Sequence, residues 1–223
     1  MTVTEAEVDS TGAASDASTE AGGQQRPTSL RARQQLRTRQ DLVRATLEVI
    51  NATGMDNATV QRITHAAGMS RATLYAHFPD GRPELLAEAY QALGRKLIRT
   101  AEGYRTQAAT GTDRICAYAQ AMLDLASQRE LGLFYNVSGP QLVGMKRRGI
   151  GSQTTLNNIT TELEHAQSQG RVDTDLDVES IAALLVGAIR EAGIDASRDP
   201  SVAPRRLTAF RQLVRALFSP QDT

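Results

Sequence analysis

The sequence predicts an all-α fold, with three N-terminal helices followed by a larger helical domain. Apolar residues recur at steps of three, four or seven along several segments, as on one buried face of a helix. Glycine stands where helices should end, as at Gly54 and Gly68, and proline where they should begin, as at Pro83 and Pro204. The alternation typical of strands is not found. The long periodic segments are 41–52, 84–104, 114–128, 155–169, 177–191 and 204–218.

Charge is distributed unevenly along the chain, although the whole is neutral. The 223 residues carry 25 basic and 25 acidic side chains. Residues 1–25 hold five acids and no base, whereas residues 26–82 hold nine arginines and four acids. A local excess of arginine is typical of a surface that meets a negatively charged partner such as nucleic acid.

Composition divides the chain into three regions. Residues 1–29 hold almost no large apolar side chain, so they cannot bury enough surface to offset the entropy lost on ordering. We predict a disordered acidic tail over 1–29, a three-helix domain over 30–82 and a larger helical domain over 83–223.

The chain also has features expected of a cytoplasmic protein. Cys116 is the single cysteine, so no internal disulfide can form and a reducing compartment fits. The acidic N-terminus lacks the apolar centre of a secretory signal. The longest apolar-rich stretch, residues 181–189, is shorter than the roughly 20 residues of a membrane span, so no membrane partner is expected.

Residues 59–77 have the pattern of a helix-turn-helix. Thr59 and Ser70 are good N-caps, and Gly68 can end the first short helix in the left-handed conformation. An ordinary helical hairpin with exposed polar residues is the alternative. The second helix would leave small, hydroxyl and basic side chains on or near its outer face, namely Arg71, Ala72, Thr73, Tyr75, Ala76 and His77.

Residues 36–78 resemble the N-terminal domain of TetR-type transcriptional regulators. The matching run is LVRATLEVINATGMDNATVQRITHAAGMSRATLYAHF. The connection that follows departs from the family pattern, because it has one extra residue and Arg82 in place of lysine. The positions that carry the resemblance are Ala45, Gly54, Thr59, Ile63, Ala67, Gly68, Leu74, Tyr75, His77 and Phe78.

The resemblance implies contacts with double-stranded operator DNA. Thr59 and Gln61 would touch the backbone or an outer base, and Ser70 would begin the recognition helix at the DNA. Arg71, Ala72 and Thr73 would lie in the major groove, while Tyr75, His77 and Arg82 would meet phosphates. The arginine arm would enter the minor groove, unless it is a solvated linker or only Arg37 and Arg39 become ordered on DNA. The arm comprises Arg31, Arg33, Arg37 and Arg39.

Two apolar stripes near the C-terminus are candidates for dimerisation, which lets two helix-turn-helix units read two half-sites. The resemblance implies that the last two helices pair with their copies in a homodimer. The alternative is that both stripes face their own core. The residues concerned are Ile181, Leu184, Leu185, Ala188, Leu207, Phe210, Leu213, Val214 and Leu217.

A ligand cavity is expected between residues 100 and 165, where large and adaptable side chains gather. Tyrosine hydroxyls would add polar contacts to an apolar cavity, which suits a small apolar or amphipathic effector of unknown identity. Each of these residues could instead serve packing alone. The candidates are Tyr104, Cys116, Tyr118, Met122, Phe134, Tyr135 and Met145.

Signals of catalysis are weak. His65, His77 and His165 lack the spacing of metal ligands, and neither a P-loop nor a GxGxxG motif is found. We therefore expect a homodimeric, ligand-responsive DNA-binding regulator, a repressor of a palindromic operator, with no metal, cofactor or catalytic site. The alternatives are a regulator of the same fold without a small-molecule effector, and a helical binding module or enzyme whose helix-turn-helix does not function.

Overall fold

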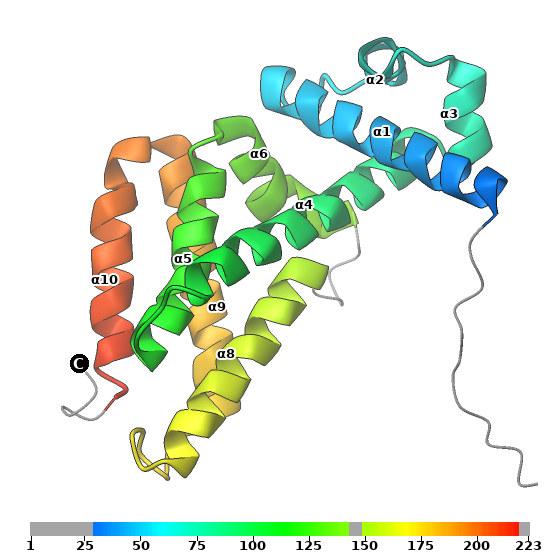
Figure 1. The fold of residues 1–223 in the computed structure, drawn as a ribbon. Coiled ribbons are helices and arrows are strands. Elements are labelled where there is room, and N and C mark those ends of the chain that lie inside the picture. The colour runs from blue at the N-terminus through cyan, green and yellow to red at the C-terminus, as the bar shows by residue number, and fades with distance from the viewer. Residues whose placement is uncertain (1–28, 143–148, 219–223) are drawn as a thin grey trace, which may run out of the picture.

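The computed structural model describes residues 29–142 and 149–218, which form helices joined by turns and contain no strand (Figure 1). The predicted all-α fold is confirmed over these residues. The predicted tail, apart from Ser29, lies outside the described residues, as does Met145.

Three helices form the N-terminal unit, here called the head: α1 (Leu30–Thr53), α2 (Val60–Ala67) and α3 (Arg71–His77). Hydroxyl caps begin them, since the side chains of Ser29, Thr59 and Ser70 accept hydrogen bonds from backbone N–H groups two or three residues into each helix. Gly68 ends α2 with a φ of 63°. The core of the head includes the fully buried side chains of Leu42, Ile50, Ile63, Leu74 and Phe78.

The arginine arm is helical from its start. Because α1 begins at Leu30 and not near residue 41, the four arginines stand on the first turns of a 24-residue helix. The alternative of a flexible linker does not apply to residues 30–40. Arg31, Arg33 and Arg37 are exposed, while Arg39 is half-buried against the rest of the head.

The larger domain, here called the body, follows in one bundle. In Figure 1, α4 runs from beneath α1 into the body, where it packs against α5 and α8. The elements are α4 (Arg82–Arg105), α5 (Gly111–Ala126), α6 (Arg129–Leu133), a π-helical turn (Phe134–Ser138), α7 (Gly139–Leu142), α8 (Ile150–Ser168), α9 (Val178–Arg198), a 3-10 turn (Pro200–Val202) and α10 (Ala203–Arg215).

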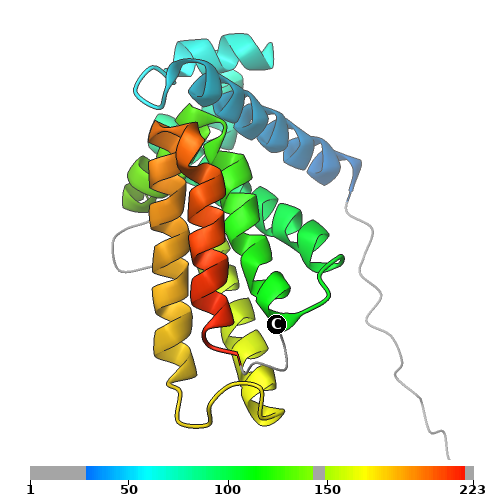
Figure 2. The same ribbon diagram turned by 90° about the vertical axis from the view of Figure 1, so that its left-hand side faces the viewer.

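The last two helices lie side by side on one face of the body (Figure 2). Their inner sides pack on α5, with Leu185, Phe210 and Val214 buried. Since α9 and α10 have no helix over their outer sides in the described chain, this face remains open to solvent.

Candidate DNA-binding surface and effector cavity

The recognition helix α3 is anchored on one side and open on the other. Leu74 is fully buried in the head core, whereas Arg71 and Ala72 are exposed and Tyr75 is 50% exposed. Arg71 has no ion pair or side-chain hydrogen bond with any described residue. A free guanidinium beside small side chains can approach the edge of a base pair closely.

The N-terminal ends of α2 and α3 are held by their own caps. The hydroxyl of Ser70 accepts from the N–H of Thr73 at 3.0 Å and lies 2.9 Å from the Thr73 hydroxyl. Thr59 and Gln61 are exposed at the start of α2. The structure therefore places Thr59, Gln61, Ser70 and Arg71 at accessible helix starts, while Thr73 is half-buried and bonded to its cap.

Arg39 joins α1 to the end of α3 and the start of α4, a role that the sequence did not predict. Its guanidinium donates to the carbonyl of His77, lies 3.5 Å from the carboxylate of Glu84 and stands 4.0 Å over the centre of the Phe78 ring. The helical arm causes this arrangement, because it brings Arg39 over the end of α3. In this structure Arg39 therefore secures the position of α3, whereas Arg37 stays exposed.

Arg82 was expected to contact a phosphate, but its guanidinium is bonded within the protein. Its Nε donates to the carbonyl of Ala58 at 2.8 Å and its Nη2 to that of Met55 at 2.7 Å. These carbonyls belong to the loop between α1 and α2, where the Met55 carbonyl also accepts from the N–H of Ala58 at 3.1 Å. Arg82 thus closes that loop, and its guanidinium is turned inward.

The longer connection between α3 and α4 is accommodated by Gly81. Its φ is 66°, a conformation that L-residues with a side chain rarely adopt, and it serves as the N-cap of α4. A Cβ at this position would lie 2.9 Å from Cε1 of Tyr75. Glycine here therefore allows the turn and leaves room for the Tyr75 ring on the recognition helix.

A cavity of about 740 Å³ lies in the body and is lined by α4, α5, the π-helical turn, α7, α8 and α9, here called the α4–α9 cavity. Three predicted ligand residues, Tyr118, Met122 and Tyr135, line it. Its size is within the usual range of small-molecule sites. The structure thus brings together about half of the predicted ligand set.

The remaining predicted ligand residues lie elsewhere. Tyr104 is 39% exposed near the end of α4, where its hydroxyl donates to Asp124. Cys116 is buried among packing residues, and burial raises the pKa of its thiol to about 11. Phe134 packs edge-on against Tyr90 and does not reach the cavity surface.

Polar groups of the cavity come largely from residues that sequence reasoning missed. Arg190 is the one charged residue among the described lining side chains, and its Nε donates to the Asn136 carbonyl at 3.0 Å. That carbonyl belongs to the π-helical turn, a feature often found at functional sites. In the sequence, the available signal for Arg190 was its position as a single cation directly after the apolar stripe of α9.

Tyrosine hydroxyls complete the polar surroundings of the cavity. The hydroxyl of Tyr135 is buried and finds no hydrogen-bond partner among the described residues. Burial raises the pKa of this tyrosine, and it raises the pKa of Tyr118 to about 12. Both hydroxyls therefore stay protonated near neutral pH, and the Tyr135 hydroxyl keeps a hydrogen-bond donor that no described residue accepts.

The predicted dimerisation stripes divide between two faces. Leu185, Phe210 and Val214 are buried in the body, whereas Leu184 is 69% and Leu213 is 50% exposed. The half-buried members are Ile181, Ala188, Leu207 and Leu217. Part of the stripes thus serves the core, and part remains on the open face of α9 and α10.

Other kinds of site receive no support from the described chain. Within it, no group of three or more histidine, cysteine, aspartate or glutamate residues could hold a metal ion. None of its helices combines the length and the apolar character that crossing a membrane requires.

Comparison with known proteins agrees with this geometry. Residues 42–89 match the model of the tetR family of bacterial regulatory proteins, and no curated protein matches the chain. A TetR-family regulator from Pectobacterium atrosepticum is similar in structure, with a TM-score of 0.70 and 18% identity over 83% of this chain and 96% of that one.

Two regulators named FadR are similar in structure as well, and the first of them is a fatty acid degradation regulator. The Bacillus halodurans protein has a TM-score of 0.64 and 17% identity, covering 78% of this chain and 96% of its own. The Bacillus subtilis protein, solved with stearoyl-CoA, has a TM-score of 0.62 and 17% identity, covering 77% and 96%. At these identities the likeness concerns the fold, while the family assignment depends on the head. Residues 42–89 thus match the N-terminal domain of the tetR family of bacterial regulatory proteins, and the chain as a whole shares its fold with a regulator of that family.

Proposed function

We propose that the chain is a homodimeric repressor in the cytoplasm that binds a palindromic operator and is released by a small amphipathic effector. The observation that carries this proposal is the recognition helix, with Leu74 anchored in the core and Arg71 free on the outer face. The α4–α9 cavity supports the part of the proposal that concerns an effector.

The proposed DNA contacts follow from exposure. Arg71 would pair with a base in the major groove, with Ala72 allowing close approach, and Tyr75 would bond a phosphate. Thr59, Gln61 and Ser70 would contact the backbone from the helix starts, and Arg37 would reach the flanking DNA. Thr73 and His77, both half-buried, would contribute at the edge of the surface. Arg39 and Arg82 would act indirectly, since their guanidinium groups already hold the head together.

A dimer is proposed because one helix-turn-helix buries little surface on DNA, whereas two units read half-sites about one helical turn apart. The open face of α9 and α10 offers Leu184 and Leu213 for this contact. An exposed apolar patch of this kind is typical of a protein interface.

The effector is proposed to have an apolar body and a head group that accepts hydrogen bonds or carries negative charge. Arg190 would bind the head, and the Tyr135 hydroxyl would donate to a buried acceptor. The stearoyl-CoA bound to the Bacillus subtilis neighbour is a molecule of this amphipathic type. Binding would release DNA because α4, which contributes Tyr90 and Leu97 to the cavity, also supports the head. The effector can shift this equilibrium only by its difference in affinity between the two states.

The test begins with selection of DNA fragments from a random pool, followed by fluorescence anisotropy at several salt concentrations. We expect a palindromic site whose affinity falls steeply with salt. Binding without sequence preference would contradict the operator, and a site with a single half would contradict the dimer. If the protein leaves DNA only with a protein partner, the alternative of a regulator without a small-molecule effector is favoured.

The effector is tested with a panel of amphipathic carboxylates and acyl thioesters, including stearoyl-CoA, by thermal shift and by release of the selected DNA. Arg190→Gln should weaken the active compound about tenfold, as for loss of one charge-assisted hydrogen bond, and leave operator affinity unchanged. Arg205→Gln, which removes an exposed cation of α10, is the matched control. If Arg190→Gln binds the active compound as tightly as the unchanged protein does, Arg190 is not part of the effector site.

A further inference from the structure

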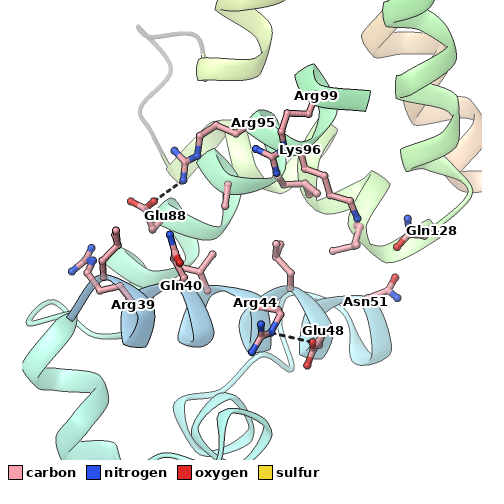
Figure 3. Close-up of a pocket in the computed structure, with 16 residues that line it drawn as sticks. Arg39, Gln40, Arg44, Glu48, Asn51, Glu88, Arg95, Lys96, Arg99 and Gln128 are labelled. Carbon is pink, nitrogen blue, oxygen red and sulfur yellow. Dashed lines mark hydrogen bonds and ion pairs between the residues drawn. The ribbon is translucent and has the colours of Figure 1, made fainter. Parts of the chain in front are cut away.

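A second hollow lies outside the α4–α9 cavity, where the head meets the body. It has a volume of about 620 Å³ and is lined by α1, α4 and α6, with Gln128 just before α6, and is here called the α1–α4 groove (Figure 3). Its position is on the side of α1 that faces α4, whereas α2 and α3 lie on the other side (Figure 3). The groove is thus separate from the DNA-reading surface and from the effector cavity.

The floor of the groove is apolar. Val43 and Leu47 come from α1, Leu93 from α4 and Leu131 from α6, and Val43, Leu93 and Leu131 are almost fully buried. A floor of this kind can hold the hydrocarbon part of a ligand, because burial of apolar surface is favourable.

The rim of the groove carries an excess of positive charge. The two acidic residues that line it are already neutralised, since Glu88 pairs with Arg95 at 2.8 Å and Glu48 lies 3.9 Å from Arg44. Lys96 and Arg99, one turn apart on α4, line the same groove and make no ion pair or side-chain hydrogen bond within residues 29–142 and 149–218. The free charge of the groove is therefore cationic.

Polar side chains also line the groove on the side toward which Lys96 extends. Figure 3 shows the Lys96 side chain extending from α4 into the space between α1 and α6, with the amides of Asn51 and Gln128 on its far side. An ammonium group with neighbouring carboxamides can bind a carboxylate or phosphate through several charge-assisted hydrogen bonds.

We propose that the α1–α4 groove binds a small anionic amphiphile, with its apolar part on Val43, Leu47, Leu93 and Leu131 and its carboxylate or phosphate at Lys96 and Arg99. Charge complementarity selects this occupant, because an anionic group can pair with the two exposed cations at the rim and an uncharged molecule cannot. A ligand seated here contacts the head through α1 and the body through α4 and α6. Its binding is therefore coupled to the relative placement of the head and the body.

The experiment is isothermal titration calorimetry of the full chain with octyl phosphate, kept below its micellar concentration. Inorganic phosphate tests the anion alone, and 1-octanol tests the apolar part alone. We expect saturable binding of octyl phosphate, and binding of either fragment at least about tenfold weaker, since each lacks half of the contacts. Equal affinity for inorganic phosphate or for 1-octanol would overturn the proposal.

Variants locate the bound molecule. Lys96→Gln combined with Arg99→Gln should weaken octyl phosphate about tenfold or more, while circular dichroism and the thermal midpoint verify that the fold is kept. Arg205→Gln is the matched control for loss of a cation. Arg190→Gln changes the α4–α9 cavity and leaves the groove intact. If this variant alone loses binding of octyl phosphate, the molecule binds in the α4–α9 cavity and the groove site is overturned. That result is independent of whether the proposed effector releases DNA.

The acidic N-terminal segment is a rival occupant of the groove, because residues 1–25 carry five acids. Removal of residues 1–28 should leave the affinity for octyl phosphate unchanged. If octyl phosphate binds only after this removal, the segment fills the groove in the intact chain and the proposal fails.

Discussion

At the scale of single residues, the arginines in the head and at its junction with α4 have two distinct tasks. Arg71 is free on the outer face of α3, whereas Arg39 and Arg82 donate to backbone carbonyls at the end of α3 and in the loop between α1 and α2. The residue type and the local excess of charge are the same for all three. Their tasks differ because a buried carbonyl without a hydrogen bond is costly, so an arginine near one turns inward.

Arg71→Ala should weaken binding to the selected operator by about 1–3 kcal/mol, because a guanidinium that reads a base is lost. Binding to unrelated DNA should change far less. Anisotropy titrations with both DNAs measure the difference, and Arg62→Ala, which removes an exposed cation of α2, is the control. A uniform loss on both DNAs would mean that Arg71 contacts phosphate and not a base.

Arg82→Ala should lower the free energy of unfolding by about 1–3 kcal/mol, since the loop between α1 and α2 loses two hydrogen bonds from the guanidinium. Chemical denaturation measures this change. The dependence of DNA affinity on salt should stay the same. A salt slope reduced by about one phosphate contact, at unchanged stability, would restore the direct contact that the family resemblance implied.

At the scale of elements, the connection from α3 to α4 determines how the recognition helix is presented. Gly81 allows the turn, and the Tyr75 ring packs in the space that its missing side chain leaves. The cation over Phe78 then holds the end of α3 against α1. These contacts orient α3 before any DNA is bound.

Gly81→Ala should destabilise the head by about 1 kcal/mol or more, because alanine is strained at this φ and its Cβ meets Tyr75. Thermal unfolding gives the stability, and operator affinity gives the effect on α3. Gly103→Ala is a matched control, since a Cβ there meets no atom within 4 Å and the position is inside α4. Equal stability of the two variants would show that the turn adjusts freely.

The elements also show which parts of the fold can be predicted from the sequence. Periodicity located the long helices because each buries one stripe, as Leu86, Leu93 and Leu97 do on α4. It gave no helix between residues 129 and 142, where a π-helical turn changes the spacing of the buried side chains. It also placed the start of α1 too late, because the arginine arm has little apolar character, although Ser29 offers a cap.

Site residues were predictable where a local pattern determines exposure, as on α3. They were not predictable where a partner distant in sequence decides. Arg82 bonds to carbonyls more than twenty residues away, and Arg190 reaches the π-helical turn from α9. For the same reason Tyr104, although aromatic and in the right segment, faces Asp124 and not the cavity.

At the scale of the whole molecule, the open face of α9 and α10 is where two copies would join. We expect Leu213→Glu to give a monomer in light scattering, because it places a charge in an apolar contact. Leu184→Glu should act in the same way. Gln212→Glu, on an exposed neighbouring position of α10, is the control that adds a charge beside the patch. A dimer mass that persists in both leucine variants would contradict this interface.

The length of α4 has a further consequence under the proposed function. This helix of 24 residues is about 36 Å long and belongs to both ends of the molecule. A tilt of about 5° at its cavity end would carry the head through about 3 Å, which is close to the rise of one base pair. Under the proposed function α4 would act as a stiff lever, so that a small tilt caused by the effector would change the distance between the two recognition helices on DNA.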